Sequence, residues 1–473
     1  MKNRLSLLSL GAVCLFTSSA NAQNVLVVLI DDLGADEVAL YTPDANTAPT
    51  PTLEALAADG VRFENAWAMP NCSPTRATLL TGRYPTRHGV GVALPFGPDL
   101  PDEEVILPEV YRRSAQLGGP DVATSIVGKW HLVQLGQDIV HPVTRGFSFY
   151  DGDNLGGLGQ PFSYEQWPRT IADDQGASKT SIETGYATTV QVDAARDWIA
   201  EQAGPWFCYL ALHAPHTPFH APPAELHSYD LEGLDIEQDP IPFFHAMTEA
   251  ADTELGRLLS EIDPAVLAET TVIVIGDNGT TGDVVEAPFD PTRSKGSLYR
   301  NGIRVPLIVS GNQVAFPGRE VDALVDVSDL FATSLELSGV DWQAALPEGL
   351  EVDSVSLLPY VVQPFATPQR DWILSQTKAP VLDFLPGDGI TFLNLITANI
   401  DLIAGAVAAN GTTVRNGGFK FIRNSTGFEE LYNLTADPFE DVNLLLLPFL
   451  PAPAAAAYAE LAAVVDELGF EAN

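Results

Sequence analysis

Five short apolar runs mark out the first part of this chain. They are NVLVVLI (24–30), TSIVG (124–128), WFCYLAL (206–212), TVIVIG (271–276) and VPLIVSG (305–311). Runs of this length without polar alternation are typical of strands that are buried on both faces. Helical patterns lie between them at 51–60, 190–204 and 244–262. The alternation predicts an α/β fold with a large, mainly parallel sheet sandwiched by helices.

The rest of the chain has a different character. The segment 133–189 is rich in glycine, aspartate and aromatic residues without clear periodicity, which predicts loops over the strand ends. From about residue 365, antiparallel strands are predicted at 371–377 and 412–424, the second with an Asn416-Gly417 turn. We therefore predict a main domain over 23–364 and a smaller C-terminal antiparallel β-sheet subdomain over 365–473, closed by a terminal helix.

The N-terminus has the pattern of an export signal. Lys2 and Arg4 precede an apolar run over 5–16, and Ala20-Asn21-Ala22 fits a signal-peptidase site. The run is shorter than the roughly 20 residues that a membrane-spanning helix needs. We predict a cleaved signal peptide over 1–22, a periplasmic or extracellular protein, and no stable membrane anchor.

Charge and cysteine content limit the partners. The formal net charge is −38, and removing the signal peptide, which has two positive charges and no negative one, leaves −40. Such a surface argues against nucleic acid or an anionic membrane as partner, because both require clustered lysine and arginine. Only Cys72 and Cys208 then remain. A disulfide between them is possible but not required, since Cys208 lies in an apolar run where cysteine commonly acts as a small hydrophobe.

Polar side chains follow two of the predicted strands at the point where each ends. Asp31 and Asp32 follow the first run, and Asp277 and Asn278 follow the fourth. Ligands bind beyond the carboxyl ends of the strands in sheets of this kind. Oxygen ligands in this number suit a hard divalent cation, Ca²⁺ before Mg²⁺. Each pair alone is equally compatible with an ordinary turn or helix cap, and both pairs together favour a metal.

A lone cysteine, Cys72, is the second residue of the stretch NCSPTRATLLTGRYPTRHG at 71–89. Ser73 is a suitable N-cap, Pro74 suits the first helical position, and Gly82 is expected to end the helix. Cys72 would then stand at a helix N-terminus, where backbone N–H groups attract anions, with Arg76 one turn further in. The alternative is a capped helix beside a buried cysteine.

These residues carry a family resemblance. CSPTRATLLTG matches the Cys-x-Pro-x-Arg motif of the sulfatases throughout, and GKWHL at 128–132 matches their second signature. VLIDDLG, APHTPF, VIGDNG, SKGSLYRNGIRVPLIV and ELYNLTADPFEDVNL match in family order and span residues 24 to about 445. The chain resembles a sulfatase of the alkaline-phosphatase-like superfamily, which implies that fold and the hydrolysis of sulfate esters.

The resemblance implies an unusual nucleophile. In this family a separate maturation enzyme oxidises the motif cysteine to Cα-formylglycine, so Cys72 would work as a hydrated aldehyde. One hydroxyl of the hydrate would attack sulfur and displace the substrate alcohol. The other would expel sulfate by reforming the aldehyde, so that water need not attack a crowded sulfur.

The resemblance also implies the supporting roles. Asp31, Asp32, Asp277 and Asn278, with residue 72 itself, would bind one Ca²⁺. Arg76 would hold the aldehyde hydrate, and Lys129 and Lys295 would bind the sulfate oxygens. His131 would act as base for the elimination, and His216 would assist departure of the substrate oxygen. The alternative for Lys129 and Lys295 is a surface lysine, and the alternative for His131 is a hydrogen-bonded core residue. His213 is expected to lie behind His216 without touching the substrate, and His88 is given no catalytic role.

Two departures and two alternatives qualify this interpretation. Where relatives commonly have Tyr-Glu-Gly-Gly, this chain has YRNG at 299–302, which could alter the substrate rim, and Asn71 is slightly atypical. A phosphonate monoester or phosphodiester hydrolase of the same superfamily is the alternative function. A secreted binding protein without turnover is disfavoured because every expected position is occupied. The acidic surface further suggests a small or sparsely sulfated ester as substrate.

Overall fold

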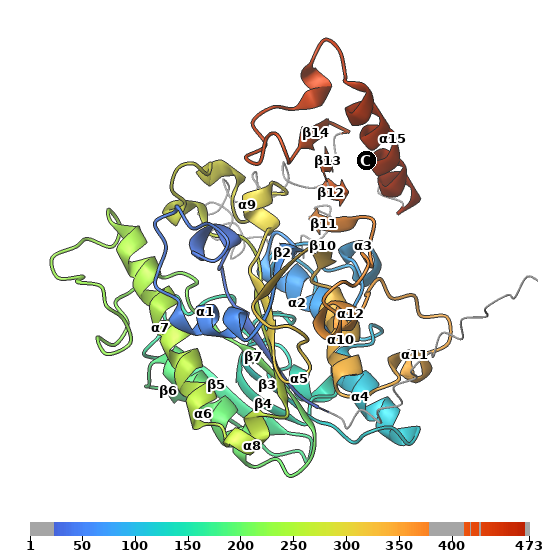
Figure 1. Cartoon of the computed structure of the whole chain (residues 1–473). Coiled ribbons are helices and arrows are strands. Elements are labelled where there is room, and N and C mark those ends of the chain that lie inside the picture. The colour runs from blue at the N-terminus through green and yellow to red at the C-terminus, as the bar shows by residue number, and fades with distance from the viewer. Residues whose placement is uncertain (1–22, 378–410, 417, 425–426, 469–473) are drawn as a thin grey trace, which may run out of the picture.

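The computed structural model describes residues 23–377, 411–416, 418–424 and 427–468 (Figure 1). The predicted signal peptide and Gly417 lie outside these residues. Within the described part of the chain, no helix is both long and apolar enough to cross a membrane.

A ten-stranded sheet forms the centre of the molecule. Its strand order is β10-β2-β9-β8-β1-β7-β3-β4-β5-β6. The five strands from β8 to β4 in this order are mutually parallel: β8 (Thr270–Gly276), β1 (Asn24–Ile30), β7 (Trp206–Ala211), β3 (Ala123–Lys129) and β4 (Phe149–Asp153). The predicted mainly parallel sheet is therefore confirmed.

Antiparallel strands flank this parallel centre. On one side β9 (Leu307–Ser310) runs antiparallel to both β8 and β2 (Gly60–Trp67), and β10 (Arg319–Asp326) follows at the edge. The run at 305–311 is thus a strand as predicted, but its direction is opposite to that of its neighbours.

The expectation of loops over 133–189 is wrong in part. This segment contributes β4 and also the hairpin of β5 (Trp167–Asp173) and β6 (Ser178–Glu183). The hairpin forms a sheet edge, and β6 is largely exposed to solvent. Because such a strand buries little apolar surface, its sequence SKTSIE lacks the alternation on which the prediction depended.

Helices cover both faces of the sheet and create two apolar cores. One core includes side chains of α1 (Pro51–Ala58), α6 (Ala187–Ala200) and α7 (Pro240–Glu261). The other includes side chains of α2 (Cys72–Thr81), α4 (Leu107–Gln116) and α10 (Asp329–Leu337). Successive β1 residues point to opposite faces, so Val25, Val27 and Leu29 enter the second core and Leu26, Val28 and Ile30 the first. This explains the uninterrupted apolar run.

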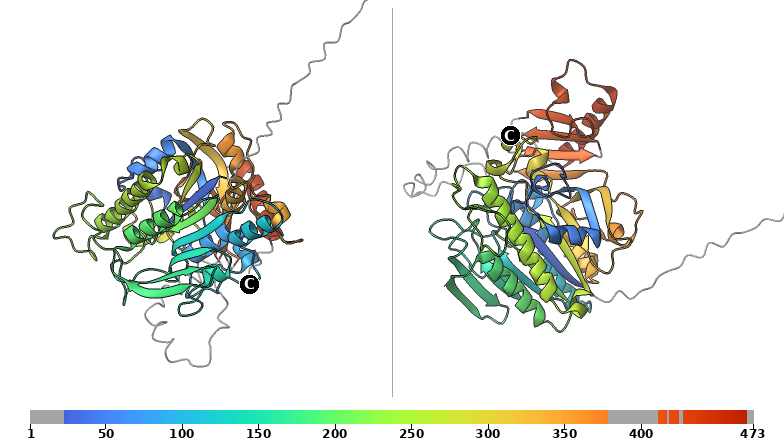
Figure 2. Two further views of the ribbon diagram at one scale, coloured as in Figure 1. Left: turned by 90° about the horizontal axis from the view of Figure 1, so that it is seen from below. Right: turned by 60° about the vertical axis from the view of Figure 1, so that its left-hand side comes forward.

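A small antiparallel sheet forms the C-terminal part, as predicted. Its strands are β11 (Ile373–Thr377), β12 (Gly411–Asn416), β13 (Phe419–Asn424) and β14 (Glu429–Asn433), and α15 (Ala452–Glu467) packs on them. Figure 2 shows β12–β14 standing outside the main sheet. The remaining helices are short: α3 (Pro85–His88), α5 (His141–Thr144), α8 (Pro264–Leu267), α9 (Arg300–Ile303), α11 (Trp342–Ala345) and α12 (Leu358–Val362).

Candidate active site

Strand ends bring the predicted acidic residues together. Asp31 and Asp32 follow β1, and Asp277 and Asn278 follow the adjacent strand β8. The two strands are parallel and in register, with Ile30 opposite Gly276. The backbone N–H of Asp32 donates to Oδ1 of Asp277 at 3.0 Å, and Nδ2 of Asn278 donates to Oδ1 of Asp32 at 2.8 Å. All four residues are buried.

Helix α2 delivers Cys72 to this cluster. Cys72 is the first residue of the helix, and Gly82 ends the helix in the left-handed conformation with φ 66°, as predicted. The predicted N-cap is wrong, because Asn71 occupies that position and Oγ of Ser73 instead accepts from the N–H of Leu94 at 3.1 Å.

The thiol of Cys72 is buried and neutral. Its Sγ lies 3.3 Å from Oδ1 of Asp31 as a hydrogen-bond donor. Burial and the charges of Asp277 and Asp31 raise the pKa of Cys72 well above its ordinary value. Because the thiolate is the nucleophilic form of cysteine, the unmodified side chain is inert here. Cys208 is also buried and free, so the two cysteines form no disulfide.

Three cationic side chains balance the three buried carboxylates. Nη1 of Arg76 donates to the carbonyl oxygen of Lys129 at 2.7 Å, and Nη2 lies 3.0 Å from Oδ2 of Asp277. Lys129 forms an ion pair with Asp31, and Lys295 with Asp32. Without a bound ion the site is therefore close to electrically neutral.

The carboxylates differ in their protonation. Burial raises the pKa of Asp277 to about 6, the neighbouring Asp31 charge adds to this, and Arg76 opposes it. Burial would also raise the pKa of Asp32, but the charge of Lys295 and the hydrogen bonds from Lys295 and Asn278 hold the pKa below its ordinary value.

The two predicted catalytic histidines are held by backbone carbonyls in opposite tautomers. Nδ1 of His216 lies 2.7 Å from the carbonyl oxygen of Thr217, and Nε2 of His131 lies 3.1 Å from that of Leu94. A carbonyl only accepts, so these ring nitrogens carry the protons. The lone pairs are then on Nε2 of His216 and on Nδ1 of His131. The latter atom is buried and has no hydrogen-bond partner within the described part of the chain.

Both histidines are neutral in this site. Burial, with the Lys295 charge next in importance, lowers the pKa of His216 to about 3. Burial and the charges of Lys129 and Arg76 lower the pKa of His131 well below its ordinary value.

The cluster can hold a cation. Among the described residues, ligand atoms of Asp31, Asp32, Cys72 and His216 all lie within 4.8 Å of one another. Nε2 of His216 lies 3.8 Å from Oδ2 of Asp32. Oδ1 of Asn278 is buried and has no hydrogen-bond partner among the described residues. The predicted oxygen ligands thus lie in or beside this cluster, which also includes His216.

Two of these residues have an uncommon backbone conformation. Asp32 has φ 64° and His131 has φ 55°, in the left-handed region that non-glycine residues rarely occupy. Strained conformations of this kind persist where the surroundings hold them and are concentrated at functional sites.

His213 belongs to a layer of buried residues behind the site, and the other members of this layer, Gln191, Asp153 and Tyr164, were missed from the sequence. Nδ1 of His213 is 2.7 Å from Nε2 of Gln191, and its Nε2 is 3.3 Å from Oδ1 of Asp153. The hydroxyl of Tyr164 donates to the carbonyl oxygens of His213 and His216 at 2.8 and 2.7 Å. Asp153 ends β4, so the strand-end rule would have found it had that strand been predicted. His88 lies outside this layer and contacts Thr78 at 3.0 Å.

The two side chains that depart from the family pattern in YRNG form hydrogen bonds within the fold. Nη1 of Arg300 donates to the carbonyl oxygen of Pro438 at 3.0 Å, and Nδ2 of Asn301 donates to Oδ2 of Asp36 at 3.0 Å. Both side chains therefore have partners within the fold.

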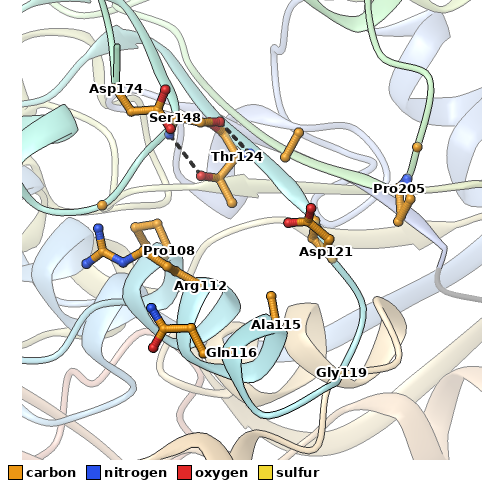
Figure 3. Close-up of a pocket in the computed structure, with 14 residues that line it drawn as sticks. Pro108, Arg112, Ala115, Gln116, Gly119, Asp121, Thr124, Ser148, Asp174 and Pro205 are labelled. Atoms are coloured by element: carbon orange, nitrogen blue, oxygen red, sulfur yellow. Dashed lines mark hydrogen bonds between the residues drawn. The ribbon is translucent and has the colours of Figure 1, made fainter. Parts of the chain in front are cut away.

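A separate pocket of about 690 Å³ opens at the other end of the sheet. Its lining includes Ala123, at the start of β3, and Pro205, just before β7, together with Arg112 and Asp121 (Figure 3). It thus lies at the amino ends of strands whose carboxyl ends carry the cluster, and it is not part of this site.

Comparisons with known proteins identify the family. A model of the sulfatase family matches residues 23–340. The chain is 29% identical to human N-acetylgalactosamine-6-sulfatase over 72% of its own length and 66% of that protein, and 28% identical to human arylsulfatase A over 74% and 70%. It thus spans about two thirds of the length of these relatives.

Solved structures share the fold. The crystal structure of Ps i-CgsB in complex with k-i-k-neocarrahexaose superposes with a TM-score of 0.74 at 21% identity, covering 96% of this chain and 94% of that one. That of the PsFucS1 sulfatase from Pseudoalteromonas sp. gives 0.69 at 19% identity, with 95% and 91% covered. The chain belongs to the sulfatase family, a family of sulfuric ester hydrolases.

We expect the Arg76→Met variant to be strongly destabilised when metal-free. It leaves the Asp277 and Asp31 carboxylates buried beside one cation fewer, which should lower the free energy of unfolding by about 3–5 kcal/mol at pH 8. The loss should be smaller at pH 5, because Asp277, with a pKa of about 6, then binds a proton. Urea unfolding at both pH values tests this. Arg196→Met, which removes a surface ion-pair partner, is the control; a loss at Arg76 that is equally small or independent of pH would contradict the charge balance.

Proposed function

We propose that this protein hydrolyses a sulfate ester to an alcohol and inorganic sulfate. The observation that carries the proposal is the position of Cys72. It begins a helix at the point where three buried carboxylates and three cations meet. A tetrahedral oxyanion ester bound there would have its reacting atom beside residue 72 and its oxygens beside cationic groups.

Residue 72 acts, in this proposal, after conversion to Cα-formylglycine by a maturation enzyme. A buried neutral thiol is a poor nucleophile, whereas a hydrated aldehyde presents two hydroxyls at the same place. One hydroxyl forms the new O–S bond while the bond from sulfur to the substrate oxygen breaks. The remaining hydroxyl loses its proton as the C–O bond to sulfate breaks, which restores the aldehyde, and water hydrates it again.

Protons are moved by groups with suitable lone pairs. Asp277, whose charge acts on the side chain of residue 72, is suited to take the proton of the attacking hydroxyl. His131 takes the second proton on Nδ1, which has no other partner among the described residues. His216 has a lone pair on Nε2 in the free site, so it first takes a proton there from solvent when the bound anionic ester offsets the Lys295 charge. It then gives this proton to the departing oxygen.

We propose that Asp31, Asp32, Asp277, Asn278 and residue 72 hold one Ca²⁺. When bound, the ion supplies positive charge that favours ionisation of the hydrate and offsets the charge of the sulfate oxygens. The carboxylates would then turn to the ion. Lys129 and Lys295, which pair with those carboxylates here, would become available to the sulfate oxygens.

The substrate we propose is a small or sparsely sulfated ester. Arg76 and Lys129 are fully buried and Lys295 is largely buried. The cations of the site would therefore interact with one sulfate group that is in contact with them. The acidic surface would repel a long polyanion. Export by the signal peptide would place the enzyme in the periplasm or outside the cell.

Conversion of Cys72 is expected to decide activity. Intact mass spectrometry of the peptide that contains Cys72 should show the aldehyde in active preparations and the thiol in inactive ones. Cys72→Ala should abolish turnover, whereas Cys208→Ala should retain it because Cys208 lies in the strand β7. Full activity with an intact Cys72 thiol would refute the proposed nucleophile.

Calcium is expected to stabilise the fold through Asn278. An ion at 100 times its dissociation constant adds about 2.7 kcal/mol to the free energy of unfolding. Thermal unfolding with Ca²⁺ or with a chelator measures this gain. Asn278→Ala should shift the gain to higher Ca²⁺ concentrations, and Asn312→Ala, at an exposed position, should not. No effect of Ca²⁺ on wild-type stability would rule out the site.

Substrate preference distinguishes the candidate reactions. We expect turnover of 4-nitrophenyl sulfate to exceed that of 4-nitrophenyl phenylphosphonate, and monosulfated sugars to be better substrates than highly sulfated polysaccharides. Initial rates under identical conditions provide the comparison. A higher kcat/KM for the phosphonate would favour the alternative hydrolase, and a preference for polysulfated chains would refute the proposed substrate class.

A further inference from the structure

Two adjacent glycines lie against the rings of the two histidines. Gly156 and Gly157 follow β4 in the sequence DNLGGLGQ. A Cβ at Gly156 would lie 2.8 Å from Nε2 and 3.1 Å from Cε1 of His131. A Cβ at Gly157 would lie 2.7 Å from both Nδ1 and Cε1 of His216. Such distances are far inside van der Waals contact, so this loop fits over both rings only because these residues have no side chain.

Backbone conformation does not explain these glycines. Neither Gly156 nor Gly157 has a positive φ, so alanine is compatible with the backbone at both positions. Gly159 in the same loop also lacks a positive φ, but a Cβ there would meet only Cδ of Pro218 at 3.9 Å, an ordinary contact. The three positions therefore differ in the space beside them rather than in their backbone.

The contact at Gly157 bears on the hydrogen bond that fixes His216. A Cβ at this position would also lie 3.0 Å from the carbonyl oxygen of Thr217, which is the partner of Nδ1. Both members of the hydrogen bond would thus be crowded at once. The imidazole would have to rotate, and Nε2 would leave its place 3.8 Å from Asp32.

The contact at Gly156 bears on the hydrogen bond that fixes His131. The crowded atom is Nε2, which donates to the carbonyl oxygen of Leu94. His131 is buried and its φ is already 55°, so the ring has little freedom to move aside. Without this hydrogen bond, the proton of His131 would no longer be fixed on Nε2, and the lone pair would no longer be fixed on Nδ1.

We propose that Gly156 and Gly157 are positioning residues for the two proton-transfer steps. Gly157 holds His216 for departure of the substrate oxygen, and Gly156 holds His131 for release of sulfate. The loop that carries both glycines follows β4 and packs against the two rings. This inference rests on the sulfate ester hydrolysis proposed above and adds residues for which the sequence motifs give no role.

The two glycines should affect different steps, which a pair of substrates can separate. Phenyl sulfate has a poorer leaving group than 4-nitrophenyl sulfate and depends more on proton donation to the departing oxygen. We expect Gly157→Ala to lower kcat/KM for phenyl sulfate by at least tenfold more than for 4-nitrophenyl sulfate, since a positioned acid contributes roughly 10²–10⁴-fold. Gly159→Ala should match the wild type on both substrates.

Gly156→Ala should instead slow the later step. We expect kcat to fall by a similar factor for both substrates, with a burst of 4-nitrophenol followed by slow turnover as the sulfated residue accumulates. Equal losses on the two substrates with Gly157→Ala, or no burst with Gly156→Ala, would overturn the corresponding assignment.

A stability cycle tests the contact independently of activity. If the Cβ at position 157 acts through the ring of His216, Gly157→Ala should lower the thermal midpoint, and the double variant with His216→Ala should recover most of that loss. Additive losses in the thermal midpoint would overturn the proposed contact. This holds even where Gly157→Ala alone folds poorly, because the double variant would then recover nothing. Absence of sulfatase activity in wild-type protein with converted Cys72 would refute the proposed function instead, and leave the stability result to be judged alone.

Discussion

The balance of charge at the carboxyl ends of β1, β3 and β8 is the constraint on which the site depends. Asp31, Asp32 and Asp277 are fully or almost fully buried, and carboxylates in such surroundings are unstable unless they are paired. Arg76, Lys129 and Lys295 supply the pairing. These cations come from a helix, a strand and a loop that are distant in sequence. The charge balance therefore holds this helix, strand and loop together at one site.

The C-terminal sheet supports the same site from behind. Oγ of Ser375 in β11 donates to the carbonyl oxygen of Ala68 at 2.8 Å, just before the cysteine motif. Lys420 of β13 forms a buried ion pair with Glu440, and Glu440 accepts from the backbone N–H of Arg300 at 2.7 Å. The segment that carries Lys295 is thus held between the main sheet and the C-terminal part. Removal of the residues after 365 would remove these hydrogen bonds and this ion pair as well as part of the protein surface.

The sequence allowed the centre of the fold and most of the site to be predicted, because both follow from local patterns. Buried parallel strands consist of apolar runs that can be recognised in the sequence. Parallel strands end at the same edge of the sheet, so Asp31 and Asp277 could be predicted to lie together. Strand direction is not encoded in such a run, so the reversal of β9 could not be predicted. The β5–β6 hairpin shows no alternation of apolar and polar residues, so it was not predicted. β4 was not predicted either, and Asp153 at its end was therefore missed. The ring position of His131 depends on the carbonyl of Leu94, which only the folded chain brings near. His216 bonds the carbonyl of the next residue, Thr217, but its position beside Asp32 likewise depends on the fold.

Local balance also explains how an acidic protein can present a site for an anion. The net charge of −38 is spread over the whole chain, and at moderate salt the field of exposed charges fades over roughly 8–10 Å. The three cations of the cluster are buried or nearly so, and such charges are screened far less. If a divalent cation binds there as proposed, the neutral cluster would become positive, because the carboxylates would coordinate the ion and the cations would be available to the ester. The same buried side chains would then stabilise the metal-free fold and, in the metal-bound protein, attract an anionic group.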